Sequence, residues 1–520
     1  MKPTIFFNGA IFTGDSRKPW VEALVIEGGR IVFAGGQVEA LSYSAETKID
    51  LGGRLVLPGF NDAHLHFVEG GKGMLGLNLR DADSLEEFLV RIGNYARKLA
   101  PGKWITSWGW DHENWPEKRY PTRQDVDQVT PQHPLLLFRL DGHLAVANSL
   151  ALKAAGIHGS KKIPGGEILL DSRTGEPNGV LKDKAAEIVA SQIPRESLSD
   201  RKEAIHVALS HAATLGVTSV QEMETRLEDY EIYSELAEKG DLSARIYAVP
   251  LLENRNQFEG LPQNDFLQVG GAKLFSDGSL GAGSAWMFEP FNDEPNTTGL
   301  SIYSPDELRA IFEDADQKGW QICVHAIGTR ANHEVVRAFE SLLKSQRNAR
   351  RHRVEHVQLI RDEDMRQMAR LGLLASIQPV HYWDDQRWLV RRIGEGRLPL
   401  AYRLESFFRA KIPVAFGTDW PVEDLNPLLG LFSAVARSYD LNTPEEGISL
   451  KTAIRAYTSG SAYAEFVEDK KGRLLEGQFA DLVVLSENIF KLPPEDFKDV
   501  PIDLTMVGGK IYYESQNAKF

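Results

Sequence analysis

Pro58-Gly59-Phe60-Asn61-Asp62-Ala63-His64-Leu65-His66 is the stretch that decides the fold. It completes an apolar run that begins at Leu55, and the pattern predicts one buried strand with both histidines at its C-terminal end. Side chains alternate across a strand, so His64 and His66 face the same side. Imidazole nitrogen is a good ligand for zinc and similar divalent ions. The stretch therefore predicts half of a metal site.

Three later apolar runs end in further candidate ligands. His325, His356 and Asp419 each follow a separate run of β-branched and other apolar residues. The C-terminal ends of parallel strands meet on one face of a barrel, so we expect these side chains to gather around His64 and His66. Polar residues at the ends of several strands are hard to explain as ordinary polar groups of the core. They therefore strengthen the interpretation of the HxH pair as part of a metal site.

Lys273 ends another such run and is the last member of the predicted set. A free ammonium would repel a dication, whereas a neutral lysine in a pocket of low dielectric can react with CO2. The resulting carbamate is an anion that can bridge two metal ions. The alternative is a lysine that pairs with Asp277 or holds a substrate carboxylate, and the sequence leaves both open.

The middle of the chain alternates strand-like and helical runs, which favours a parallel α/β architecture. A closed (β/α)8 TIM barrel needs eight strands. About ten runs can be picked out, ending near Asp62, Ser107, Phe138, Val220, Ala248, Phe275, His325, His356, Gln378 and Thr418. The surplus pair, near Ser107 and Phe138, lies in a tryptophan-rich segment. We predict an insertion at about residues 70–205, after the first barrel strand.

Both ends of the chain have the texture of short strands separated by glycine pairs. Neither end has enough strands to bury a core alone. We therefore predict a small β-sandwich domain composed of residues 1–56 and 470–520, with the barrel and its insertion at 57–469. Exposed strand edges in such a domain make a homodimer plausible.

Composition narrows the classes of partner. The 520 residues carry 59 Lys and Arg against 73 Asp and Glu, and this formal charge of −14 disfavours a nucleic-acid partner. The single cysteine, Cys323, cannot form an internal disulfide. No stretch reads as a secretory signal or a membrane span, so we expect a cytoplasmic protein with a small-molecule substrate and no membrane partner.

Four side chains outside the ligand set are candidate substrate contacts. His143 follows Arg139-Leu140-Asp141-Gly142, Trp110 and Asp111 close an aromatic cluster, and His381 lies beyond another apolar run. Tryptophans in the insertion can line a pocket, although core packing is the more usual role for at least half of them.

The motifs PGFNDAHLH, GGAKLFSDGSLG, VHAIG, RVEHVQ and GTDWPV, in this order, resemble the amidohydrolase superfamily. More narrowly they are similar to the branch that includes N-substituted formamide deformylase, and the similarity covers nearly the whole chain. The resemblance implies hydrolysis of amide, formamide or related C–N bonds with one or two divalent metals, often zinc. It maps the metal ligands onto a set that this sequence retains: His64, His66, Lys273, His325, His356 and Asp419.

A mechanism follows from this ligand set. Metal coordination lowers the pKa of a water molecule, Asp419 takes the proton and later delivers it to the leaving nitrogen, and His143 or His325 stabilises the oxyanion. Two alternatives remain: a single-metal deaminase that makes no use of a carboxylated Lys273, and a sensor or regulatory protein that keeps the fold without turnover.

Overall fold

Two parallel sheets form the centre of the protein. The computed structural model describes residues 3–159, 162–344, 346–437, 443–516, 518 and 520. One sheet has the strand order β16-β15-β14-β8 and the other β17-β18-β19-β20-β21. Their bounds are β8 (Phe60–Leu65), β14 (Val217–Met223), β15 (Arg245–Val249), β16 (Leu267–Val269), β17 (Gly271–Phe275), β18 (Gln321–Ala326), β19 (Arg353–His356), β20 (Leu374–Ile377) and β21 (Val414–Phe416).

The two sheets are joined at both of their meeting points. The Lys273 backbone N–H donates to the Pro250 carbonyl at 2.8 Å, which brings β17 beside the end of β15. On the other side the Asp419 N–H donates to the His64 carbonyl at 2.7 Å, so the end of β21 lies beside β8. This arrangement is TIM-barrel-like, and eight of the ten predicted runs lie in its parallel strands.

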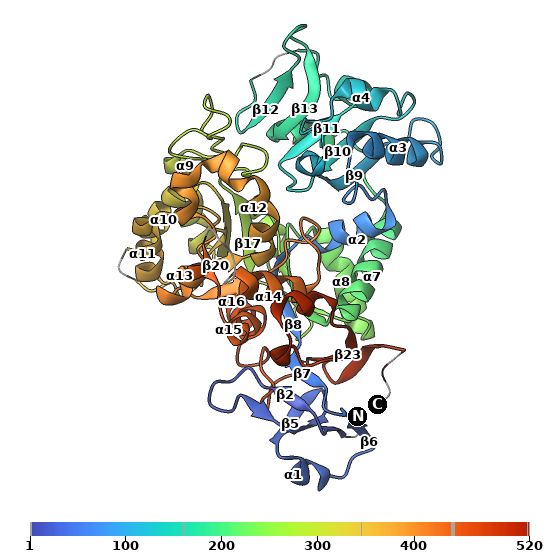
Figure 1. Cartoon of the computed structure of the whole chain (residues 1–520), viewed down its shortest axis with the longest axis vertical. Coiled ribbons are helices and arrows are strands. Elements are labelled where there is room, and N and C mark those ends of the chain that lie inside the picture. The colour runs from blue at the N-terminus through green and yellow to red at the C-terminus, as the bar shows by residue number, and fades with distance from the viewer. Residues whose placement is uncertain (1–2, 160–161, 345, 438–442, 517, 519) are drawn as a thin grey trace.

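Helices alternate with these strands along the chain (Figure 1). They bury one face each: in α10, Val335, Val336 and Phe339 are buried whereas Arg337 is exposed. Local signals fix their starts, as in α9, where Ser304 and Glu307 form a capping box around Pro305. The main helices are α2 (Phe67–Leu75), α7 (Leu198–Thr214), α8 (Leu227–Lys239), α9 (Pro305–Gln317), α10 (Thr329–Leu343), α11 (Asp362–Leu371), α12 (Pro379–Ile393), α13 (Leu404–Arg409) and α14 (Pro427–Ala436).

A separate five-stranded sheet lies at one end of the molecule, above α2 in Figure 1. It contains both surplus runs, in β9 and β10, and α3 (Leu85–Ala96) packs beside it. Helices α2 and α7 pack against each other, so the chain leaves the parallel sheets and returns to them side by side. The strands are β9 (Ile105–Trp110), β10 (Leu135–Arg139), β11 (Leu144–Ala147), β12 (Gly166–Leu170) and β13 (Pro177–Asp183).

Strands from both ends of the chain lie together at the opposite end of the molecule (Figure 1). A six-stranded sheet, β24-β23-β22-β7-β2-β3, and a four-stranded sheet, β5-β4-β1-β6, share a core that includes Phe6, Leu24, Val484 and Leu504. The strands are β1 (Thr4–Phe7), β2 (Ala10–Phe12), β3 (Trp20–Val21), β4 (Ala23–Glu27), β5 (Arg30–Gly35), β6 (Thr47–Asp50), β7 (Leu55–Pro58), β22 (Leu482–Leu485), β23 (Ile502–Val507) and β24 (Lys510–Glu514).

The strand prediction around the HxH motif is wrong in one respect. Residues 55–58 form β7 of the terminal sheet, where they pair with β2 and β22, and the histidine-bearing strand β8 starts at Phe60. Gly59 makes this change of sheet possible, because a Cβ there would meet the Thr218 side chain at 2.2 Å. The apolar run therefore serves two sheets in succession, and His64 lies within β8 while His66 follows it.

No helix in the described parts of the chain is both long and apolar enough to cross a membrane.

Candidate metal centre

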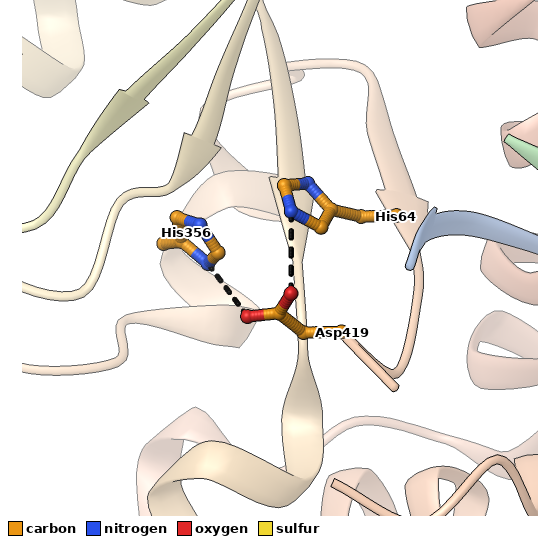
Figure 2. Close-up of side chains that lie close together, drawn as sticks. All are labelled: His64, His356 and Asp419. Atoms are coloured by element: carbon orange, nitrogen blue, oxygen red, sulfur yellow. Dashed lines mark ion pairs between the residues drawn. The ribbon is translucent and has the colours of Figure 1, made fainter. Parts of the chain in front are cut away.

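Three of the predicted ligands meet at the C-terminal ends of three strands. His64 comes from β8, His356 ends β19, and Asp419 follows β21 (Figure 2). One ligand atom from each lies within 4.8 Å of the others. His64 Nε2 is 3.4 Å from Asp419 Oδ1, and His356 Nδ1 is 3.9 Å from Asp419 Oδ2. All three side chains are buried. The spacing of His64 Nε2 and Asp419 Oδ1 suits a nitrogen and an oxygen atom that share one divalent ion.

His66 and Lys273 lie at the edge of this cluster. His66 Nε2 is 3.3 Å from Asp419 Oδ1, on the same carboxylate oxygen that faces His64. Lys273 Nζ is 3.3 Å from His64 Nε2, and the lysine is only 1% exposed. Burial lowers the pKa of Lys273, although the nearby carboxylates of Glu355 and Asp419 oppose that shift. A lysine with a lowered pKa is the kind that can react with CO2.

His325 completes the set from β18. Its ring centroid is 4.7 Å from that of His356, and its Nδ1 is 3.1 Å from Asp277 Oδ1. Asp277 also accepts the backbone N–H groups of Ile327 and Gly328, at 3.1 and 2.8 Å. These bonds hold the ring through Nδ1 and leave Nε2 without a hydrogen-bond partner among the described residues. The structure thus brings together all six predicted ligands, with His64 and His66 from one βα unit and the other four from four separate units.

A second layer of polar side chains holds the candidate ligands, and sequence reasoning missed most of it. Glu355 Oε2 lies 2.7 Å from His64 Nδ1, and Glu224 Oε2 lies 3.2 Å from His66 Nδ1. Gln378 Oε1 lies 2.8 Å from His356 Nδ1. Histidine ligands commonly engage a carboxylate or carbonyl through their second nitrogen. Glu355 was detectable in principle, because it precedes His356 in a fully buried strand that has no reason to carry an unpaired acid.

Burial and neighbouring charges set the protonation of the site. Burial lowers the pKa of His325 and His356 well below its usual value, which keeps both imidazoles neutral and able to ligate. Burial disfavours the ionised Asp419 carboxylate, but the adjacent His64 and His66 outweigh it and hold the pKa of Asp419 well below its usual value. For His66, burial is opposed by Asp419 and Glu224, which raise its pKa to about 10.

Unpaired buried atoms supply a test of whether these residues fit a metal. Among the described residues, His325 Nε2 is buried with no hydrogen-bond partner, and the buried Asp419 Oδ1 has only His64 Nε2 and His66 Nε2 at ion-pair distance. A buried polar atom without a partner costs about 1–3 kcal/mol, so such atoms in a native protein need an explanation. Both belong to the cluster and both are good donors to a divalent cation. The donor set therefore fits a bound divalent metal.

Three of the four predicted substrate contacts border one pocket beside the cluster. Asp111, His143 and His381 line it together with His325, His356 and Asp419. The His143 ring centroid lies 5.0 Å from that of His325, and its Nδ1 is 2.7 Å from Asp183 Oδ1.

Trp110, the fourth predicted contact, lies elsewhere. Its side chain is fully buried in the core of the insertion, stacks on Trp115, and donates from Nε1 to the Leu137 carbonyl at 2.9 Å. We therefore assign it no substrate contact. Trp108 lies beside the metal cluster, with its ring centroid 6.2 Å from that of His66. Trp108 pairs with Phe138 and Trp110 pairs with Arg139, and a register shift between these two pairs gives the two tryptophans different surroundings. The sequence does not reveal this shift.

A profile of the amidohydrolase family matches residues 47–513. The chain belongs to the amidohydrolase family. It is 33% identical to the protein LONG AFTER FAR-RED 3 of Arabidopsis thaliana, over 97% of this chain and 91% of that protein. It is 31% identical to the putative amidohydrolase YtcJ of Bacillus subtilis (strain 168), over 98% and 99%, respectively.

The more specific resemblance is confirmed as well. N-substituted formamide deformylase of Arthrobacter pascens is 25% identical over 99% of both chains. Among solved structures, an uncharacterized metal-dependent hydrolase from Pyrococcus horikoshii OT3 is 29% identical and aligns with a TM-score of 0.76, covering 95% of this chain and 99% of that one. Family membership and the nitrogen–oxygen cluster together support a divalent-metal hydrolase.

Proposed function

We propose that this amidohydrolase cleaves carbon–nitrogen bonds other than peptide bonds, in amide, N-substituted formamide or N-acyl substrates. The observation that carries the proposal is the convergence of His64, His356 and Asp419 within 4.8 Å, with three further predicted ligands beside them. The relative named N-substituted formamide deformylase supports this substrate class. We also propose that the two parallel sheets form one closed (β/α)8 barrel and that the terminal sheets form a sandwich-like domain.

The residues proposed to hold the metal are His64, His66, Lys273, His325, His356 and Asp419, with zinc as the proposed ion and either one or two ions per chain. A bound divalent ion would supply Lewis acidity and lower the pKa of water at the site.

The side chains of this protein would carry the proton transfers and orient the substrate. The Asp419 carboxylate is placed to accept a proton from the attacking water and to return it to the leaving nitrogen. The pKa of Asp419 lies well below its usual value, so the carboxylate is ionised at neutral pH. His143 faces the same pocket from the insertion. Burial is opposed by the Asp183 carboxylate, which raises the pKa of His143 and favours an imidazolium that can donate to a developing oxyanion.

Substitution of Asp419 by Asn tests the proposed base. The Asp419→Asn variant should retain at least part of its zinc, measured by mass spectrometry of the purified protein, and lose turnover of N-formyl and N-acyl amines by several hundredfold or more. A matched control is Glu238→Gln, which removes an exposed carboxylate on α8. An Asp419→Asn variant with full zinc and wild-type turnover would exclude Asp419 as the base.

A screen with N-formyl, N-acyl and cyclic amides then tests the reaction class. Hydrolysis of any of them by the zinc-loaded wild type, and its loss in the double variant His64→Asn/His66→Asn, would support the proposal. Release of ammonia from amino-substituted heterocycles, with no hydrolysis of amides, would favour a deaminase instead. Purified protein that contains no metal and gains no activity with added zinc or manganese would favour the regulatory alternative. A relative with a regulatory name, the exoenzymes regulatory protein AepA of Pectobacterium carotovorum, is 26% identical to this chain.

A further inference from the structure

Carboxylates line the wall of the site pocket formed by helix α12 and the segment after Asp419. Asp384 and Asp385 lie one turn after His381 on α12, and Glu423 follows Asp419 by four residues. All five of these polar side chains line the same pocket. Leu140, Leu280, Ile327, Trp388 and Val422 supply apolar walls. The pocket is therefore lined by the candidate metal ligands, by apolar side chains and by carboxylates.

Most other acids of this pocket already have a cationic partner. Arg139 donates to Asp111 at 2.6 Å and to Asp141 at 2.7 Å. Arg80 Nη2 lies 3.0 Å from Glu423 Oε2. Each of these carboxylates is therefore held by an arginine, with Arg139 shared between Asp111 and Asp141.

Asp384 and Asp385 differ from those acids. Within the described part of the chain neither forms an ion pair, and Asp385 accepts a hydrogen bond from the neutral Tyr402 hydroxyl. Arg387, the basic residue nearest in sequence, directs its guanidinium to Asn114 and to the Asp384 backbone carbonyl. Burial raises the pKa of Asp385 to about 8, and burial together with the neighbouring Asp384 raises the pKa of Glu423 well above its usual value. In both groups burial is the largest cause of the raised pKa, and neighbouring carboxylates add to it.

His381 supplies an independent sign that a ligand belongs in this pocket. Its side chain is only 8% exposed, and its Nε2 has no hydrogen-bond partner among the described residues. Gln358 holds the other ring nitrogen at 3.1 Å, so Nε2 is directed toward the pocket, 3.7 Å from Asp419 Oδ2. His381 therefore lies between the metal cluster and the acidic pair, where the polar middle of a substrate would pass.

We propose that Asp384 and Asp385 form a subsite for an organic cation, such as a primary ammonium, at the end of the substrate remote from the scissile carbon–nitrogen bond. The inference rests on the proposed function and narrows its substrate class to N-acylated amines that carry a second, cationic amine. One helical turn is about 5 Å, so the acidic pair begins roughly that far beyond His381 along α12. A spacer of about four carbons matches this distance.

Binding of uncleavable analogues tests the subsite without relying on turnover. The zinc-loaded protein is titrated calorimetrically with 4-(methanesulfonamido)butylammonium and with N-pentylmethanesulfonamide, which differ in a terminal ammonium against a methyl group. We expect the ammonium compound to bind at least tenfold more tightly to the wild type. The double variant Asp384→Asn/Asp385→Asn should reduce this preference to less than twofold.

The control variant Glu228→Gln/Glu238→Gln removes the same two negative charges from exposed positions on α8 and should keep the preference. Equal binding of the two compounds by the wild type overturns the subsite, and this comparison decides the question even if the double variant does not fold. A preference retained by a folded Asp384→Asn/Asp385→Asn variant overturns it as well.

The matching formamides separate this inference from the proposed function. If N-pentylformamide is hydrolysed as fast as the formamide that carries a terminal ammonium in place of its methyl group, and binding shows no preference, the hydrolase proposal stands and the subsite proposal is wrong. A charge preference in binding without hydrolysis of either formamide would leave the subsite and remove the hydrolase.

Discussion

Glu355→Gln tests how the second layer of side chains prepares the metal site. Glu355 is fully buried, accepts from Arg353 Nε at 2.6 Å and Nη2 at 3.0 Å, and holds His64 Nδ1 at 2.7 Å. Arg353 and His64 together lower the pKa of this carboxylate although its burial acts to raise it, so it is ionised. Glutamine keeps the shape of the side chain but replaces one acceptor oxygen with an N–H donor.

The expected magnitudes follow from these contacts. Whichever way the amide is oriented, its N–H faces a donor, either on Arg353 or on His64. Breaking a buried ion pair costs about 3–5 kcal/mol. Arg353 keeps Gln221, Ser376 and the Ala63 carbonyl as acceptors, so we expect the lower end, about 3 kcal/mol. Loss of such a partner of a metal-binding histidine typically weakens metal binding about 10–100-fold.

Two assays read these effects separately. Urea unfolding of metal-free protein gives the loss of stability, and competition with a chromophoric zinc chelator gives the dissociation constant of the metal. Glu238→Gln, exposed on α8, serves as the matched control and should change neither value. A Glu355→Gln variant with wild-type zinc affinity would refute the reasoning that Glu355 orients His64 for a metal, and wild-type stability would refute the account of the buried pair.

Three other predictions concern buried side chains outside the metal cluster. Trp110→Ala should cost about 3–5 kcal/mol in urea unfolding because it empties a fully buried site, yet leave zinc affinity unchanged; weakened zinc binding would return Trp110 to the site. Burial lowers the pKa of His352 to about 4, so its neutral form, whose Nδ1 accepts the Ile322 N–H at 3.0 Å, contributes stability above pH 6.5 that is lost as the pH falls toward 4. Metal-free His352→Gln should therefore lose less stability over that range, by up to about 3 kcal/mol in total, and an unchanged pH dependence would contradict the assignment. Burial raises the pKa of Cys323 to about 12, so iodoacetamide at pH 8 should label this thiol after denaturation but not in the native protein, as mass spectrometry can record.

Most residues of the candidate site could be predicted from the sequence because they lie in short motifs. Each of His64, His325, His356 and Asp419 ends or follows an apolar strand, and parallel strands necessarily bring such ends to one face. The same logic found the extra strands near Ser107 and Phe138, which lie outside the parallel sheets. These inferences use only periodicity and order along the chain, which a sequence states directly.

The wrong predictions for the strand at Leu55 and for Trp110 have one physical cause. Contacts between segments that are distant in the sequence leave no pattern in the residues next to them. The run beginning at Leu55 belongs to a sheet completed by β22, more than 400 residues away, and only that pairing separates it from the strand that carries His64. The burial of Trp110 depends on a shifted register with β10.

The HxH stretch and its later counterparts predicted the family, the types of candidate ligand and the order in which these residues reach one face. Tertiary structure alone decided which carboxylates hold those ligands and which remain without a cation. Glu355 and Glu224 became partners of His64 and His66 through packing of separate strands. Asp384 and Asp385 stayed uncompensated because the arginines of the pocket engage other groups. Charge balance in a buried site is a sum over neighbours in space, and those neighbours exist only after the chain has folded.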